Sequence, residues 1–144
     1  MFTDCYCTQF RRASNALTRI YDDALRPLGL RITQFSLLRA LGRLGGATST
    51  ELAEEVALDR TTISRNVKLL IDSGWVDVKP AADKRERVLS LNKAGRKVIG
   101  DATPYWQIAQ KRVEDGTAKY LRSPTHEQLL KALEVLQAAA DSRD

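Results

Sequence analysis

The stretch from Thr48 to Leu91 places the tightest limits on what this chain can fold into. It reads TSTELAEEVALDRTTISRNVKLLIDSGWVDVKPAADKRERVLSL. Thr48 and Glu51 have the spacing of a capping box, which predicts a short helix beginning at this point. Asp59 is a suitable N-cap for a second helix over about 60–73. Two short helices joined by a tight turn are typical of a helix-turn-helix.

A β-hairpin is predicted directly after the second helix. Trp75 to Lys79 has the alternation and the β-branched content of a strand, and residues 87–91 form a second strand. The loop between them carries the polar run DKRER at its tip. Two helices followed by such a hairpin indicate a winged helix-turn-helix. We therefore expect a mainly α-helical fold with a small β-hairpin wing.

The second helix of this unit has an outer face of hydroxyls and cations. Helical spacing turns Ile63, Val67, Leu70 and Ile71 inward. It leaves the following residues outside: Thr61, Thr62, Ser64, Arg65 and Lys68. A major groove about 12 Å wide admits one such helix, with its arginine on guanine and its lysine on phosphate. An ordinary solvated helix face is the alternative, and the neighbouring cationic hairpin argues against it.

The hairpin tip offers further cations. Arg85 and Arg87 are natural contacts to phosphates or to the minor groove, and their spacing puts them on one strand face. Asp83 lies two residues before Arg85, so its carboxylate is expected to orient the Arg85 guanidinium. The alternative is a solvated turn with a weak surface salt bridge.

Amphipathic helices are predicted on both sides of this unit. A helix over about 4–26 carries a broad apolar stripe, and Thr33 is the expected cap of a helix over about 34–44. Pro104 is expected to kink a long helix that begins after Asn92, and Pro124 to open a last helix. We expect one domain over residues 1–144, divided as follows: 4–30 and 92–140 as dimerisation helices, and 31–91 as the DNA-binding region.

Composition excludes several other classes of protein. The chain has 144 residues, a formal net charge of +5, and 43% hydrophobic residues. No apolar run is long enough to span a membrane, and the first residues do not resemble a secretion signal, so we expect a cytoplasmic protein. Cys5, Cys7 and His126 are too few for a structural zinc site. We expect no metal, no cofactor and no catalytic residues.

Two other interpretations remain open. A winged-helix fold can serve as a protein-interaction module that does not bind DNA, although exposed aromatic anchors would then be expected in place of a cationic face. A thiol-based reductase built on Cys5 and Cys7 lacks both a C-x-x-C motif and an acid–base partner.

The segments LRITQFSLLRAL, TSTELAEEV, TTISRNVKLLIDSGWV and DKRERVLSLNKAGRKVI together resemble the MarR family of transcriptional regulators. The resemblance covers nearly the whole chain, and Asp83-Lys84-Arg85 is similar to the D-x-R wing motif of that family. It implies a homodimer that binds a pseudo-palindromic operator in double-stranded DNA, usually as a repressor. The expected DNA-contacting residues are Thr48, Ser49, Arg60, Thr61, Thr62, Ser64, Arg65, Lys68, Asp83, Lys84, Arg85 and Arg87.

The resemblance also implies a switch, either cysteine oxidation or a small aromatic effector. Cys7 lies near the start of the first helix, where the helix dipole and Arg11 favour a thiolate. Cys7 and Tyr21 have a spacing similar to that of the peroxide-sensing branch. Arg11 and Ile32, however, stand where that branch tends to have tyrosines. Cys5 and Cys7 point in nearly opposite directions on a helix, so a disulfide between subunits is easier to form than one between them.

An effector pocket is the second possibility for the switch. Aromatic and cationic side chains from three predicted helices are candidates for its lining, although core packing is the alternative for each of them. These candidates are Phe10, Arg11, Tyr21, Phe35, Tyr105 and Trp106.

Overall fold

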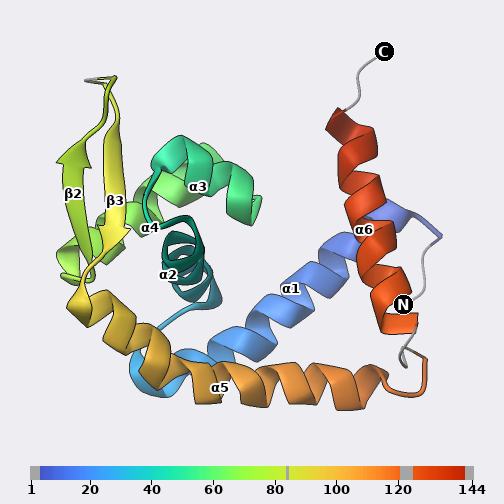
Figure 1. The fold of residues 1–144 in the computed structure, drawn as a ribbon. Coiled ribbons are helices and arrows are strands. Elements are labelled where there is room, and N and C mark those ends of the chain that lie inside the picture. The colour runs from blue at the N-terminus through green and yellow to red at the C-terminus, as the bar shows by residue number, and fades with distance from the viewer. Residues whose placement is uncertain (1–3, 84, 121–124, 142–144) are drawn as a thin grey trace. The chain divides into compact units, whose positions relative to one another are not determined.

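The computed structural model describes residues 4–83, 85–120 and 125–141, and the chain divides into two compact units, residues 1–107 and 108–144. Figure 1 traces the elements in chain order. They are α1 (Tyr6–Leu25), the 3-10 turn η1 (Arg26–Leu28), α2 (Ile32–Leu44), β1 (Ala47–Thr48), α3 (Ser49–Val56), α4 (Arg60–Asp72), β2 (Val76–Pro80), β3 (Arg87–Leu91), α5 (Lys93–Thr117) and α6 (Thr125–Asp141). The predicted mainly α-helical fold with a hairpin wing is confirmed.

The two helices of the helix-turn-helix begin where their caps predict. Thr48 Oγ1 accepts a hydrogen bond from the Glu51 amide at 3.2 Å, and Glu51 Oε2 accepts one from the Thr48 amide at 2.8 Å. Asp59 Oδ1 accepts from the amide of Thr62 at 2.9 Å. Ala57 ends α3 in the left-handed conformation, with φ at 52°. Local side-chain hydrogen bonds therefore set where both helices begin.

The prediction that Thr33 caps α2 is wrong. The helix begins earlier, at Ile32, whose amide donates to Asp22 Oδ1 of α1 at 2.8 Å. The Arg31 amide donates to Gln34 Oε1 at 3.0 Å. Because α1 supplies an acceptor for the first amide of α2, the helix needs no cap from Thr33. The Thr33 hydroxyl instead donates to Asn66 Oδ1 of α4 at 3.2 Å.

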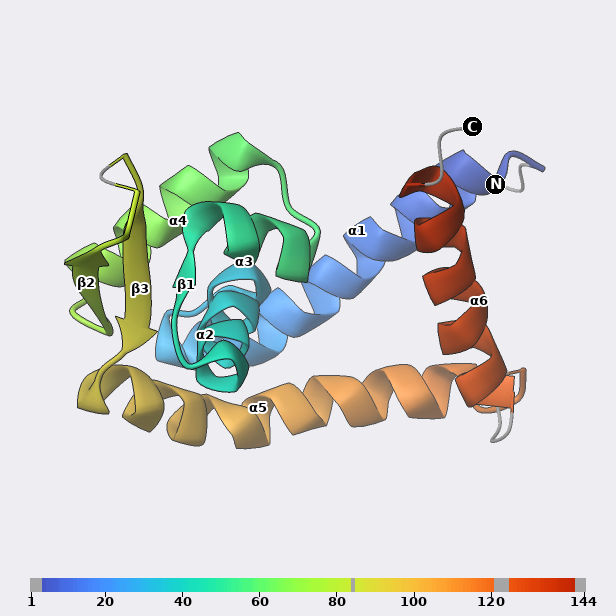
Figure 2. The ribbon, with the colours of Figure 1, turned by 45° about the horizontal axis from the view of Figure 1, so that its top comes forward.

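The wing is part of an antiparallel sheet with the order β1-β3-β2, three strands within the described residues. Strands β2 and β3 are antiparallel, and their register pairs Val76 with Leu91 and Pro80 with Arg87. The short strand β1, which the sequence did not predict, pairs Ala47 with Leu89, and Figure 2 shows it beside β3. The chain leading into α3 is thus paired with the middle of β3.

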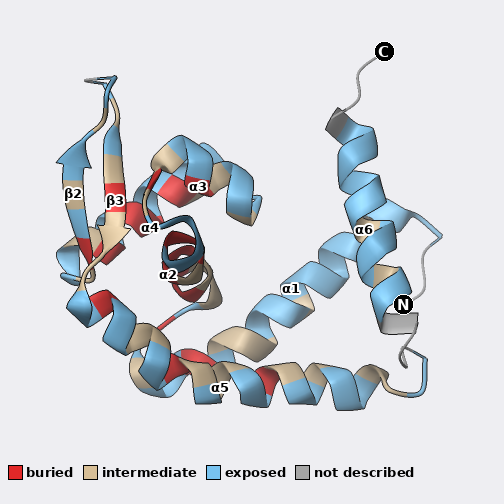
Figure 3. Cartoon of the chain, viewed as in Figure 1, coloured by how far each residue is buried: buried red, intermediate tan, exposed pale blue. Residues whose placement is uncertain are grey.

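The core of the first unit lies around α2. One apolar cluster joins α2, α3, α4 and the sheet through residues such as Leu38, Leu52 and Leu70. A second cluster joins the end of α1 to α2 and α5 through Leu25, Phe35 and Ala102. Figure 3 shows buried positions concentrated on α2, α4 and the sheet. Trp75, Val98 and Ile99 pack against both clusters and so connect them.

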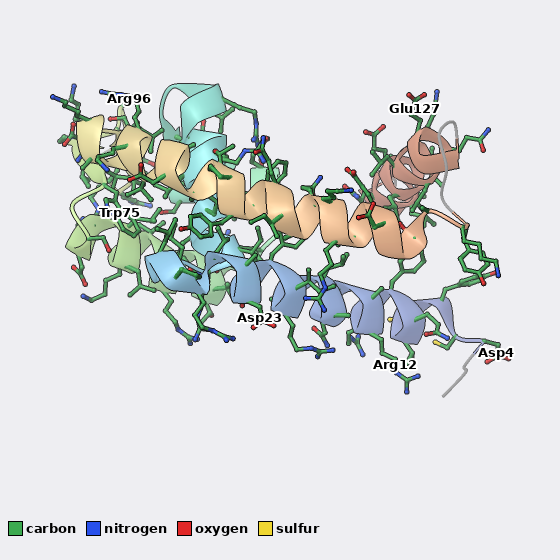
Figure 4. The ribbon with its side chains drawn as sticks, turned by 90° about the horizontal axis from the view of Figure 1, so that it is seen from below. Asp4, Arg12, Asp23, Trp75, Arg96 and Glu127 are labelled. Atoms are coloured by element: carbon green, nitrogen blue, oxygen red, sulfur yellow. The ribbon has the colours of Figure 1, made fainter. Side chains whose placement is uncertain are left out.

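The long helices leave much of their surface uncovered. On α1, Phe10 and Leu17 are 43% and 39% exposed, while Arg12 and Asp23 point outward in Figure 4. The helix α5 continues through Pro104 without a break. Ser123, Pro124 and the His126 side chain lie outside the described residues. Within the described part of the chain, no helix is long and apolar enough to cross a membrane.

Candidate nucleic-acid interface

The outer face of α4 presents polar side chains to solvent. Ile63, Val67 and Leu70 are buried against the core, which turns the opposite face outward. The exposed residues on that face are Arg60, Thr61, Ser64, Arg65 and Lys68. Thr61, Arg65 and Lys68 follow the i, i+4, i+7 spacing of one helical stripe. A continuous stripe of one hydroxyl and two cations has the shape and charge to enter a DNA groove.

Two of the predicted contacts on α4 already have partners. The Thr62 hydroxyl donates to Asp59 Oδ2 at 2.7 Å, so Thr62 contributes to the cap of the helix. These bonds from the Thr62 amide and hydroxyl lower the pKa of Asp59. Lys68 Nζ lies 2.6 Å from Asp72 Oδ2, in an exposed pair that water screens. Lys68 can exchange this weak partner for a phosphate, whereas Thr62 would first have to release its cap.

The wing tip is a hydrogen-bonded turn. The Glu86 amide donates to the Asp83 carbonyl at 3.0 Å, and Asp83 Oδ1 accepts from the backbone amide of Arg85 at 3.1 Å. The structure thus shows the Asp83 carboxylate bonded to the backbone of the turn, and its contact with the Arg85 guanidinium stays a prediction. Lys84 lies outside the described residues.

Arg85 and Arg87 are both exposed, but Arg85 lies in the turn and Arg87 in β3. The rule that residues two apart share a strand face does not apply to this pair. Both nevertheless line one cleft of about 260 Å³ between the wing, α4 and Ser49 at the start of α3. The wing cations and the first residue of α3 thus face the same hollow.

A side-chain bond holds the wing against α3. The Thr50 hydroxyl donates to Glu86 Oε1 at 3.0 Å, across 36 residues of sequence. Thr48, a predicted DNA contact, uses its hydroxyl in the capping box. The hydroxyls of Thr48 and Thr50 therefore make hydrogen bonds within the fold, whereas the Thr61 side chain is exposed on α4.

The predicted effector residues do not meet in one place. Phe35 and Trp106 pack together with ring centroids 6.3 Å apart, and both line a cleft of about 250 Å³ with Arg39 and Arg43. Other predicted members are not part of that lining: Phe10, Arg11, Tyr21 and Tyr105.

The cleft contains a feature that the sequence did not reveal. The Arg39 guanidinium lies 4.4 Å from the Trp106 ring centroid and 5.8 Å from that of Phe35. Arg43 pairs with Glu55 of α3 at 2.8 Å. The spacing of Arg39 four residues after Phe35 is the local signal that would have suggested a shared face. The Arg39 guanidinium therefore lies against two aromatic rings in the lining of this cleft.

Both cysteines lie at the start of α1 and are exposed. Cys5 is the N-cap residue, and bonds from the hydroxyl and amide of Thr8 lower its pKa. Arg11 donates to Cys7 Sγ at 3.7 Å, which is the neighbourhood predicted for Cys7. Among the described residues, no cluster of His, Cys, Asp or Glu could hold a metal ion.

Comparisons with known proteins agree on the family. The model described as MarR family matches residues 28–86. The uncharacterized HTH-type transcriptional regulator YwoH of Bacillus subtilis (strain 168) is 29% identical over 89 residues, which are 62% of this chain and 65% of YwoH. The match thus spans just under two thirds of YwoH.

Solved structures extend the likeness to almost the whole chain. The M. tuberculosis transcriptional regulator MosR in complex with DNA is 34% identical, with a TM-score of 0.77 over 95% of this chain and 98% of its own. A mutant MarR from E. coli complexed with operator DNA shares the fold at 21% identity, with a TM-score of 0.74 over 90% of this chain and 91% of its own. The chain belongs to the MarR family of winged helix-turn-helix transcriptional regulators.

Proposed function

We propose that this chain is a homodimeric, sequence-specific DNA-binding repressor whose α4 enters the major groove of a pseudo-palindromic operator. The observation that carries this proposal is the exposed stripe of Thr61, Arg65 and Lys68 beside the exposed wing cations Arg85 and Arg87. MosR of M. tuberculosis, at 34% identity, has been crystallised in complex with DNA. The complex of MosR with DNA supports the proposal that this chain also binds DNA.

The two groups of cations have different roles in this proposal. Arg65 pairs with the edge of a base, which gives sequence specificity, whereas Arg85 and Arg87 bind phosphates and fix the register. Ser49, on the first turn of α3, lines the same cleft as the wing arginines and contacts the same strand of the backbone.

The test is a set of binding curves over a range of salt concentrations, on duplexes selected from a random library by the wild-type chain. Arg85→Ala should weaken binding to all duplexes alike and reduce the salt slope by about one. Arg65→Ala should cost about 1–3 kcal/mol on the selected duplex and relax the preference at one base position. If the wild-type chain selects no sequence and binds no duplex at low salt, the protein-interaction module becomes the better interpretation.

Exposed apolar residues on the long helices support the homodimer. Leu130 and Leu136 of α6 are 48% and 55% exposed, and Leu129 and Leu133 on the same stripe are only half-buried. A second copy of the chain would cover such a stripe, and two-fold symmetry would match a pseudo-palindromic site.

A small aromatic anion is one signal that would release the DNA. The cleft beside Arg39 and Trp106 has room for about one aromatic ring, with the guanidinium available to a carboxylate. Benzoate and phenol are a suitable pair of probes because they differ in charge. Benzoate should quench the fluorescence of Trp106, measured in a Trp75→Phe background, and weaken operator binding, and Arg39→Met should abolish both effects. A quench by phenol equal to that by benzoate would contradict the role of Arg39.

Oxidation at the start of α1 is the other signal. Cys5 and Cys7 are both accessible, and the lowered pKa of Cys5 favours its reactive thiolate form. Operator binding should be measured with and without peroxide on the native chain, on Cys5→Ser and on Cys7→Ser. Loss of binding in the native chain alone supports a thiol switch that requires both cysteines. Equal binding in all samples removes oxidation from the proposal.

A further inference from the structure

The buried face of α4 contains an amide among apolar side chains. The residues of this helix that are buried are Ile63, Asn66, Val67 and Leu70. Asn66 is only 8% exposed. A buried amide destabilises the fold unless its donors and acceptor have partners, so its hydrogen bonds restrict how the helix can sit.

Both ends of the Asn66 amide are bonded. Its Nδ2 donates to the Thr62 carbonyl of its own helix at 2.8 Å. Its Oδ1 accepts from the Thr33 hydroxyl of α2 at 3.2 Å. The first bond sets the rotamer of Asn66 against α4, and the second ties that rotamer to a different helix. Apolar neighbours such as Val67 are less selective, since dispersion contacts have no preferred direction.

Thr33 is itself firmly placed. It is the second residue of α2, and the amide of the residue before it donates to Asp22 of α1 at 2.8 Å. The buried Gln34, which follows it, accepts from the amide of Arg31 at 3.0 Å. The Thr33 hydroxyl, which donates to Asn66, therefore belongs to the first turn of α2. That turn is held by one hydrogen bond to α1 and by one within α2 itself.

We infer that Thr33 and Asn66 are positioning residues for DNA reading, because their bond fixes the rotation of α4 about its own axis. This inference rests on the proposed DNA-binding function. Asn66 directly follows Arg65, so any rotation of the helix at Asn66 also moves Arg65. Side chains reach about 5–6 Å from a helix axis, so a rotation of about 20° displaces their ends by roughly 2 Å. A hydrogen bond to a base edge does not survive such a shift.

Loss of the bond should therefore affect specific binding and spare non-specific binding. Contacts to phosphates tolerate small shifts because they depend on charge, whereas base readout depends on geometry. This distinction separates a positioning role from a contribution to stability. A variant that unfolds in part would lose affinity for all duplexes by the same factor.

The experiment compares two duplexes by fluorescence anisotropy at one salt concentration. One duplex is selected from a random library by the wild-type chain, and the other is a shuffled version of the same composition. Thr33→Val, which removes the hydroxyl but keeps the shape, should raise the Kd for the selected duplex roughly three- to tenfold. It should change the Kd for the shuffled duplex by less than about twofold. Thr33→Ser, which keeps the hydroxyl, should restore the preference.

Two further variants make the test specific to this bond. In an Asn66→Leu background, Thr33→Val should have no additional effect on the ratio of the two Kd values, because the acceptor is gone. Thr103→Val is the matched control, since it removes a hydroxyl that donates to the Ile99 carbonyl within α5.

Equal losses on both duplexes, or an unchanged ratio in Thr33→Val, would overturn the inference. If the wild-type chain itself shows no preference for the selected duplex, that result contradicts the proposed sequence-specific DNA binding, on which this inference rests.

Discussion

At the scale of single residues, Thr8 is the main cause of the lowered pKa of Cys5. The hydroxyl and amide of Thr8 lower the pKa of Cys5, which raises the thiolate fraction at neutral pH. A lower pKa also weakens each thiolate as a nucleophile, but by only about half as much on a logarithmic scale, so the net effect is faster reaction. In a Cys7→Ser background, Thr8→Val should slow alkylation of Cys5 by iodoacetamide several-fold at pH 7. An unchanged rate would show that Thr8 does not activate this thiol.

Asp59 should make the stability of α4 depend on pH. Bonds from Thr62 lower the pKa of Asp59 below its ordinary value of 3.8. The cap is therefore fully effective above about pH 4, and it weakens as the pH falls through the lowered pKa. Asp59→Asn still caps the helix but cannot titrate. Urea unfolding midpoints of the two proteins should differ by a constant amount above pH 5 and converge toward pH 3. A difference that is the same at every pH would exclude this role.

At the scale of elements, Gly95 sets the distance between α5 and the start of the wing. A Cβ atom on Gly95 would lie 2.2 Å from the Trp75 carbonyl oxygen, which is backbone and cannot move aside cheaply. Gly95→Ala should therefore cost about 1–3 kcal/mol of folding free energy. Gly100, on the same helix, has no such neighbour within 4 Å. Gly100→Ala should stabilise by about 0.5–1 kcal/mol in the same urea titrations. Similar effects of the two changes would contradict this packing.

The elements that were predictable are those specified by neighbours in sequence. The caps Thr48 and Asp59 act on amides three residues away, so their patterns are visible in the chain itself. The strand β1 depends on pairing with β3 some forty residues later, and a two-residue segment has too little pattern to reveal it. The start of α2 was misplaced because its acceptor, Asp22, belongs to another helix.

The same distinction applies to the candidate site. The outward face of α4 follows from helical periodicity, so Thr61, Arg65 and Lys68 could be predicted as exposed. The contact between Asn66 and Thr33 joins residues 33 apart, and that between Arg39 and Trp106 joins α2 to α5. No local rule specifies either contact. The sequence therefore predicted the exposed face of α4, but neither the bond between Thr33 and Asn66 nor the cleft lined by Phe35, Arg39 and Trp106.

At the scale of the whole molecule, the proposed pairing of two chains depends on apolar residues that one chain leaves exposed. Leu136 of α6 is 55% exposed, and it lies on the stripe formed with Leu129 and Leu133. Burying a leucine contributes about 1.5–3 kcal/mol, and a two-fold interface counts each residue twice. Leu136→Glu should therefore raise the dimer dissociation constant by two orders of magnitude or more.

Sedimentation velocity over a range of protein concentrations would measure this change. Ala138→Glu is the matched control, because it adds the same charge at an exposed position two residues away, on the opposite side of the helix from Leu136. The control should remain dimeric where Leu136→Glu is monomeric. Operator affinity should fall with the dimer, since a monomer contacts only one half-site, and it should recover when the variant is concentrated enough to pair. A Leu136→Glu chain that stays dimeric would show that the two copies meet on a surface other than this stripe.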